Sequence, residues 1–278
     1  MTEGPVTYTR RVCRRVGVVV ILAVAATTLF AAPALAGSAG FANGTLTFTA
    51  STGESNQLEI IYNAPTIIVF DQSPIAHEPG CTTPDGSIQT FVHCTTDVPV
   101  PKLVAGFGDG DDTLAIRTGG GRTWGTSNVD LGPGNDQVPG FYTAAVVAGG
   151  TGNDRISGSR EGDRLDGGPG NDFLMGEAGS DFLIGGAGAD RMNMRSGSGG
   201  SFVGGPGPDF IVTGPGRALL VDAGSGDDRV WGGSRHLPGP RTVTLPARSV
   251  RPLLCGLGHD RVKVARGQAV RSCEGRLR

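Results

Sequence analysis

Aspartate and glycine recur together at near-fixed spacing, and their types and pattern suggest a specific chemistry. Residues 149–193 divide without a gap into the nonapeptides GGTGNDRIS, GSREGDRLD, GGPGNDFLM, GEAGSDFLI and GGAGADRMN. They follow G-G-x-G-x-D-x-U-x, where U is a large apolar residue, and outlying copies begin at Phe107 and Cys255. Glycine permits the positive φ of a tight turn, and aspartate supplies the hard anionic oxygen that Ca²⁺ prefers. The pattern therefore predicts a row of Ca²⁺ sites in stacked turns.

Well-formed turns alternate with degraded ones along the chain. The well-formed copies begin at 131, 149, 167, 185, 204 and 223, whereas those beginning at 122, 140, 158, 176, 194 or 195 and 213 depart from the motif. Each x-U-x triplet is predicted to form a short strand with U pointing inward. Two nonapeptides would then make one coil of a solenoid, with alternate turns on opposite sides. We therefore expect ions mainly along the side that holds the well-formed turns.

The candidate ligands on that side are aspartates and glycines of successive coils. The aspartate pairs expected to share ions are Asp136/Asp154, Asp154/Asp172, Asp172/Asp190, Asp190/Asp209 and Asp209/Asp228, with Asp112/Asp136 as a less regular rung. The glycines expected to bring carbonyl oxygens to them are Gly132, Gly134, Gly150, Gly152, Gly168, Gly170, Gly186, Gly188, Gly205, Gly207, Gly224 and Gly226. On the opposite side Asp163 and Asp181 could share one weaker ion, while Ala145 and Ala218 should leave sites without a ligand. The alternative interpretation of the aspartate row is a solvated acidic loop surface.

Two apolar rows are expected to form a thin continuous core between the two sides. The first is Leu114, Val138, Ile156, Leu174, Met192, Ile211 and Val230, and the second is Val129, Val147, Leu165, Leu183, Phe202 and Leu220.

The nonapeptides resemble the RTX, or hemolysin-type calcium-binding, family of secreted bacterial proteins. The resemblance covers roughly residues 107–231, with an echo at 255–263. It implies an all-β fold, a right-handed parallel β-roll, that binds Ca²⁺ between turns stacked on the same side. We accordingly assign residues 106–231 to the roll.

The segments on either side of the roll are expected to cap it. Residues 37–105 contain GTLTFTA, NQLEIIY and TIIVFD, which read as short strands separated by turns. An uncovered solenoid end would invite pairing with another chain. Residues 37–105 are therefore predicted to be a small β-rich N-terminal cap, and residues 232–278 a C-terminal capping segment.

Residues 1–36 read as a secretory signal peptide. Arginines at 10, 11, 14 and 15 precede an apolar run over 16–30, and Ala34-Leu35-Ala36 resembles a cleavage site. The run is shorter than the ~20 residues that cross a bilayer, so we expect no membrane span after cleavage; the alternative is an uncleaved anchor. We expect the mature chain to be extracellular.

Four cysteines remain after removal of that segment: Cys81, Cys94, Cys255 and Cys273. An even number in an exported chain favours disulfides, and four cysteines allow three connectivities. Because the repeat should hold its ends apart, we expect Cys81–Cys94 and Cys255–Cys273, one in each cap.

The sequence holds no catalytic motif that we recognise. His77-Glu78 is not followed by the second histidine of a zinc protease, and no Gly-x-Ser-x-Gly occurs. The formal net charge of −2 favours no nucleic-acid partner. We expect a non-catalytic protein that folds or is stabilised on Ca²⁺ binding after export, with a structural or surface-interaction role. The alternatives are a calcium-dependent module that binds a surface glycan or a protein, and a hydrolase with an unrecognised site.

Overall fold

The computed structural model describes residues 35–85, 89–96, 98, 101–118, 124–194, 200–213 and 220–232, together with four two-residue strands beyond them. All regular structure in this part of the chain is β. No helix there is long and apolar enough to cross a membrane. The predicted signal peptide, residues 1–36, lies outside the described residues except for Leu35 and Ala36.

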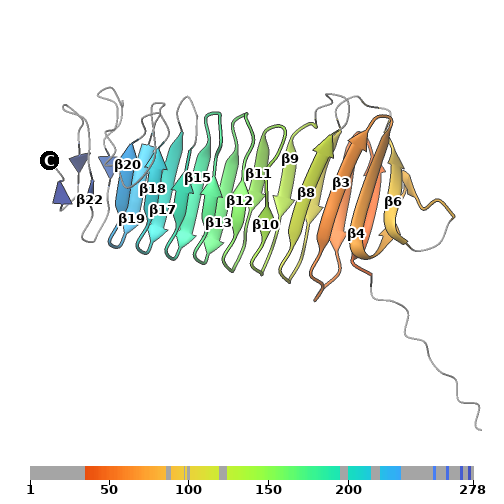
Figure 1. Ribbon diagram of the computed structural model, residues 1–278, viewed down its shortest axis with the longest axis horizontal. Coiled ribbons are helices and arrows are strands. Elements are labelled where there is room, and N and C mark those ends of the chain that lie inside the picture. The colour runs from red at the N-terminus through yellow and green to blue at the C-terminus, as the bar shows by residue number, and fades with distance from the viewer. Residues whose placement is uncertain are drawn as a thin grey trace, which may run out of the picture. The chain divides into compact units, whose positions relative to one another are not determined.

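Two parallel ladders of strands run side by side along the molecule (Figure 1). Ladder 1 contains β2 (Thr45–Ala50), β7 (Lys102–Gly106), β9 (Ser127–Asp130), β11 (Ala145–Ala148), β13 (Arg164–Pro169), β15 (Phe182–Ala187), β17 (Ser201–Pro206), β19 (Leu220–Ser225), β21 (Leu253–Leu254) and β23 (Val270–Arg271). Ladder 2 contains β3 (Gln57–Asn63), β8 (Thr113–Thr118), β10 (Gln137–Val138), β12 (Arg155–Ser157), β14 (Phe173–Met175), β16 (Arg191–Asn193), β18 (Phe210–Thr213), β20 (Arg229–Gly232), β22 (Arg261–Val262) and β24 (Gly275–Arg276).

The register of the ladders confirms the predicted coil. Ile156 pairs with Leu174 in ladder 2, and Leu165 pairs with Leu183 in ladder 1, each one coil of 18 residues further on. Alternate nonapeptides therefore lie on opposite sides, and the well-formed turns lead into ladder 2. The fold is a parallel β-roll, as expected.

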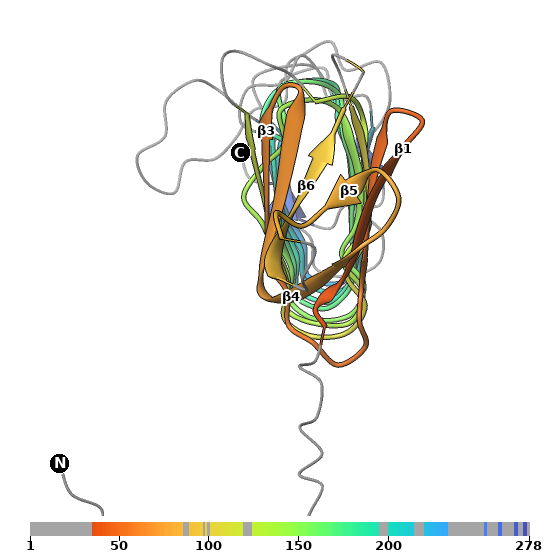
Figure 2. The same ribbon diagram turned by 90° about the vertical axis from the view of Figure 1, so that its right-hand side faces the viewer.

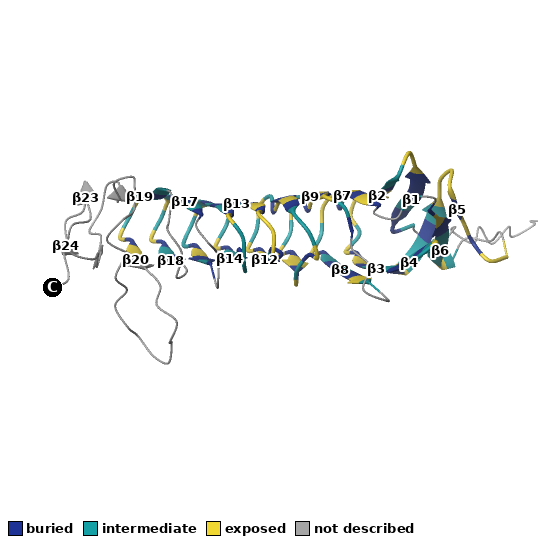
Figure 3. Cartoon of the chain, turned by 90° about the horizontal axis from the view of Figure 1, so that it is seen from above, coloured by how far each residue is buried: buried dark blue, intermediate teal, exposed yellow. Residues whose placement is uncertain are grey.

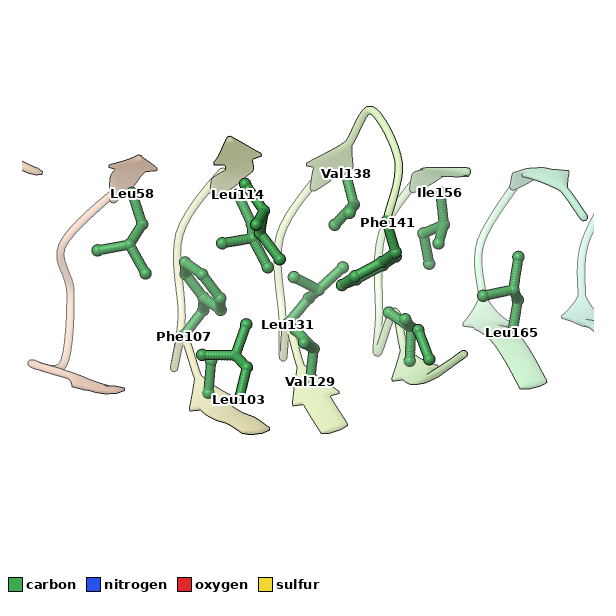
Figure 4. Packing of buried hydrophobic residues seen from close by; sticks show 14 of the residues in the cluster. Leu58, Leu103, Phe107, Leu114, Val129, Leu131, Val138, Phe141, Ile156 and Leu165 are labelled. Atoms are coloured by element: carbon green, nitrogen blue, oxygen red, sulfur yellow. The ribbon is translucent and has the colours of Figure 1, made fainter. Parts of the chain in front are cut away.

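The core is the space between the two ladders, filled by the two apolar rows. Figure 4 shows Leu114, Val138 and Ile156 facing Val129 and Leu165 across it. Along the roll the inward residues are buried and their neighbours in the strands are more exposed (Figure 3).

One predicted core residue is wrong. Val221, not Leu220, pairs with Phe202 and is buried, while Leu220 is only half-buried. The coil from Phe202 has 19 residues, and its extra residue precedes the strand, which moves the inward position on by one.

The N-terminal end is closed by strands that do not follow the repeat. β1 (Gly37–Ala42) pairs with β2, and β4 (Thr66–His77) pairs with β3 and with β6 (Gln89–Thr95), all antiparallel (Figure 2). β5 (Cys81–Thr82) adds to β6, where Cys81 and Cys94 lie opposite each other and form the expected disulfide. β2 and β3 themselves continue the two ladders, so the first coil precedes the repeat. Cys255 and Cys273 lie outside the described residues, as does all of 232–278 except Gly232 and the strands β21 to β24.

Candidate metal centre

The aspartates of the well-formed turns form one continuous hydrogen-bonded row. In each turn the backbone N–H of the aspartate donates to Oδ1 of the aspartate one coil further on, at 2.7–2.9 Å. The row contains Asp112, Asp136, Asp154, Asp172, Asp190, Asp209 and Asp228. The structure therefore brings together all of the aspartates predicted for this side, including the less regular Asp112. We call this row the aspartate ladder.

The second carboxylate oxygen has no hydrogen-bond partner in six of these side chains, from Asp112 to Asp209. The side chains are at most 2% exposed, and Oδ2 is buried without a partner in Asp112, Asp136, Asp154, Asp172, Asp190 and Asp209. A buried anionic oxygen without a partner is costly. A row of them indicates that a cation belongs beside each.

Backbone carbonyl oxygens converge on the same spaces. A Cβ added to Gly167 would lie closer than 3.0 Å to both Asp172 Oδ2 and the carbonyl oxygen of Gly185 in the next coil. The same arrangement repeats one coil away on each side, at Gly149 and Gly185. Carboxylate and carbonyl oxygens are the ligands that Ca²⁺ takes. Together they provide a plausible donor set for that ion.

Glycine is required where consecutive turns stack. Gly168 has φ +96°, and a Cβ on it would overlap the carbonyl oxygen of Gly150 in the preceding coil. Gly152, with φ +129°, stands in the same relation to Gly134. The glycines predicted for these turns therefore bring the carbonyl groups of adjacent coils close together.

Burial opposes ionisation of the ladder in the absence of metal. Loss of solvent raises the pKa of Asp136, Asp172 and Asp209 to about 7, and the charges of neighbouring aspartates add to the effect. Burial also raises the pKa of Asp154 and Asp190. A divalent cation would reverse this preference, because it stabilises the ionised form.

The opposite side makes a shorter and partly self-satisfied version of the ladder. Ala145 N–H donates to Asp163 Oδ1 at 2.7 Å, and Asp163 N–H donates to Asp181 Oδ1 at 3.0 Å. Both oxygens of Asp163 also accept hydrogen bonds from Ser159, from its N–H and its hydroxyl group. Ser159 therefore supplies the donors that Asp163 would otherwise lack. Ala218 lies outside the described residues.

Sequence reasoning missed one member of the row. Asn56 is fully buried, and its N–H donates to Asp112 Oδ1 at 2.6 Å, as each ladder aspartate does to the next. Its Oδ1 is buried without a partner. Asn56 precedes the inward-pointing Leu58 by two positions, as aspartate precedes U in the repeat. That spacing is the signal that could have identified it.

No three His, Cys, Asp or Glu side chains gather in one place among the described residues. A cation held here must therefore take most of its ligands from the backbone. The repeated glycine turns make such ligands available, which accounts for the strict coupling of glycine to aspartate in the sequence.

The RTX calcium-binding nonapeptide repeat matches this chain over 140–174, 148–183, 157–192, 166–200 and 220–234. The matched segments of this chain therefore consist of RTX calcium-binding repeats. Ca²⁺ is therefore the ion for which the RTX turns are built, in agreement with the buried carboxylate row. No curated protein and no solved structure matches the chain.

Proposed function

We propose that the protein is a secreted, non-catalytic β-roll that binds Ca²⁺ along the aspartate ladder and becomes compact after export. The observation that carries the proposal is the row of buried Oδ2 atoms without hydrogen-bond partners. The ligands would be the ladder aspartates with the carbonyl oxygens of the paired glycines, from Gly132 and Gly134 to Gly224 and Gly226. Asp181 could hold a further ion, whereas both carboxylate oxygens of Asp163 already accept hydrogen bonds from Ser159.

Calcium would act as part of the fold. Without it, ionised aspartates of adjacent coils repel one another, and the thin core has little apolar surface to offset chain entropy. A ligand that binds only the folded state adds its binding free energy to stability. Extracellular Ca²⁺ sites commonly have Kd values of roughly 10⁻⁴–10⁻³ M. Such sites stay empty in the cytosol and fill outside the cell, so folding would follow export.

The test is a Ca²⁺ titration of the chain without residues 1–36, after chelation, with circular dichroism and bound-ion stoichiometry measured together. We expect a gain of β-structure with about five ions bound, or six if the Asp112/Asp136 rung also binds. About twice that number would show that both sides bind equally and would contradict the one-sided ladder. No binding at all would contradict the proposal as a whole.

A second candidate function is a calcium-dependent module that binds a ligand on its surface. The aspartate ladder supports this second function only indirectly, because it makes the roll a rigid scaffold. The surface that contacts the ligand would be formed by the outward-pointing residues of ladder 2.

A further inference from the structure

Arginine and phenylalanine alternate in one outward column of ladder 2. The residues are Arg155, Phe173, Arg191, Phe210 and Arg229, and each pairs in register with the next. The arginines are exposed and the two phenyl rings are half-buried. Neighbouring strands lie ~4.8 Å apart, so successive arginines are about 10 Å apart with a ring between them. We call this set the arginine column.

The charges of the column are not neutralised within the part of the chain that the structure describes. The ion pairs found there are Arg117–Glu59 and Arg164–Asp166, and neither includes the column. The Arg155 guanidinium lies 4.4 Å from the centroid of the Phe173 ring, which leaves its outer N–H groups to solvent. The second outward position of β12, β14, β16 and β18 holds Ser157, Met175, Asn193 and Val212, none of them acidic.

Ladder 1 shows how the same position looks when it is neutralised. Its Arg164 also stacks on a ring, Phe182, at 4.9 Å, but it is 3.5 Å from the carboxylate of Asp166 in its own strand. Asp130 and Asp222 add further negative charge to the outward side of that ladder. The two sides of the roll therefore differ in sign although their repeats are alike.

The column is also hollowed at one end. Arg191, Phe210 and Arg229 line an open hollow of about 480 Å³ together with the turn residues Ala189, Asp190, Pro208, Asp209 and Asp227. A flat row of stacked side chains would not have such a hollow. With Ca²⁺ on the ladder to balance Asp190 and Asp209, the hollow has room for a ring-sized group beside Phe210 and the two arginines.

We propose that the arginine column binds an extended acidic polysaccharide that carries one carboxylate per disaccharide. Arginine binds carboxylates through two parallel N–H donors. The apolar face of a sugar ring packs on a phenyl ring, and a disaccharide of an extended chain is comparable in length to the spacing of the arginines. Nucleic acid fits less well, because the acidic turns and the net negative charge of the chain oppose a dense row of phosphates.

The inference rests on the calcium-built roll proposed above, since the column exists only when the coils are stacked. The calcium titration therefore comes first. If the chain binds Ca²⁺ and gains β-structure but does not bind an acidic glycan, only the inference on the arginine column is overturned. If it binds no Ca²⁺, the proposed function is overturned independently of any glycan result.

The experiment measures binding of hyaluronan oligosaccharides to the full chain in Ca²⁺ by calorimetry. The variant R155Q/R191Q/R229Q keeps the stems of the side chains and removes the three charges, and R164Q is the matched control from ladder 1. We expect the triple variant to lose at least tenfold in affinity while R164Q keeps the wild-type value. Both should keep the wild-type circular dichroism and ion stoichiometry, which separates loss of the column from loss of the roll.

Oligosaccharide length and competitor identity complete the test. A chain of three disaccharides should bind more tightly than a single one, because only the longer chain reaches all three arginines. Phe210→Ala should weaken binding without changing its dependence on salt. Equal binding of neutral dextran, tighter binding of duplex DNA, or equal loss in R164Q would each overturn the proposal.

Discussion

Replacing Asp172 by asparagine should stabilise the metal-free roll and destabilise the calcium-loaded one. The amide oxygen of Asp172→Asn can still accept the N–H of Asp154, which the carboxylate accepts at 2.8 Å. The amide nitrogen would stand where Oδ2 now faces the carbonyl oxygen of Gly185. A donor would then replace an anionic oxygen opposite that carbonyl group.

The size of the effect can be estimated for each state. Without metal, a pKa raised to about 7 from 3.8 sets a ceiling of about 4 kcal/mol on the cost of ionising Asp172 at pH 8. Because water reaches a loosened ladder, we expect Asp172→Asn to raise the free energy of unfolding of the metal-free protein by about 1–2 kcal/mol. In roughly 5 mM Ca²⁺, with a Kd of 10⁻⁴–10⁻³ M, the loss of one site lowers the free energy of unfolding by about 1–2.3 kcal/mol. Asp172 serves two pairs, so the expected loss is about 2–4.6 kcal/mol.

The assay is chemical denaturation of wild type and Asp172→Asn, each in excess chelator and in Ca²⁺, with ion stoichiometry measured on the same samples. Asp130→Asn is the control, because it makes the same chemical change at an exposed position on the outward side of ladder 1. We expect the two curves of Asp172→Asn to move in opposite directions and the stoichiometry to fall by about two. Equal destabilisation with and without Ca²⁺, or an unchanged stoichiometry, would refute the assignment of this carboxylate to metal.

Four further predictions follow from the same geometry. In chelator, stability should fall as pH rises from 4 to 8, by up to about 1.4 kcal/mol per pH unit for each carboxyl that titrates, because the folded pKa values are raised; a rise measured by thermal unfolding would contradict this. Asp163→Asn should leave the number of bound ions unchanged, because both oxygens of Asp163 already accept hydrogen bonds from Ser159; loss of one ion measured by mass spectrometry would show that Asp163 is a metal ligand. Asn56→Asp should destabilise the chain in chelator and add an ion in Ca²⁺, and a variant that binds no extra ion would place the end of the ladder at Asp112. On chelation, amide hydrogen exchange should rise first in the coils after Ala189, whereas a uniform rise along the roll would contradict the argument given below.

The parallel ladders and the aspartate row could be predicted because a strict repeat determines register. A step of 18 residues between Asp154 and Asp172 leaves only one way to stack the coils with the U residues inside. Asp112 is a less regular rung, since the coil to Asp136 has 24 residues, yet its N–H donates to Asp136 Oδ1 like the others.

Other features depend on contacts that periodicity does not contain. Asn56 lies 56 residues before Asp112, because β4, β5 and β6 are inserted between them, so no fixed step leads to it. Whether Asp163 is open to metal depends on Ser159, four residues earlier, whose backbone N–H donates to Oδ2 and whose hydroxyl group donates to Oδ1. The arginine column, likewise, requires the register of ladder 2 before its members are seen to be neighbours.

We expect the roll to depend unequally on calcium along its length, because a second row of side chains supports only its first half. Asn135, Asn153 and Asn171 occupy exposed turn positions one residue before the aspartates. The Oδ1 atoms of Asn135 and Asn153 each accept the N–H of the next asparagine at 2.9 Å, and Asn171 Oδ1 accepts the N–H of Ala189 at 2.7 Å.

These bonds are neutral and need no ion. The row stops at Ala189, which has no acceptor to offer, and the next residue in this position, Pro208, has no N–H to donate. Beyond that point the turns stack through the aspartate ladder and through backbone hydrogen bonds such as that from Gly207 N–H to the Ser225 carbonyl oxygen, and the charges of the ladder would need metal to balance them. Calcium would therefore contribute most to the coils that carry Arg191, Phe210 and Arg229, and a ligand bound there would be released when calcium is removed.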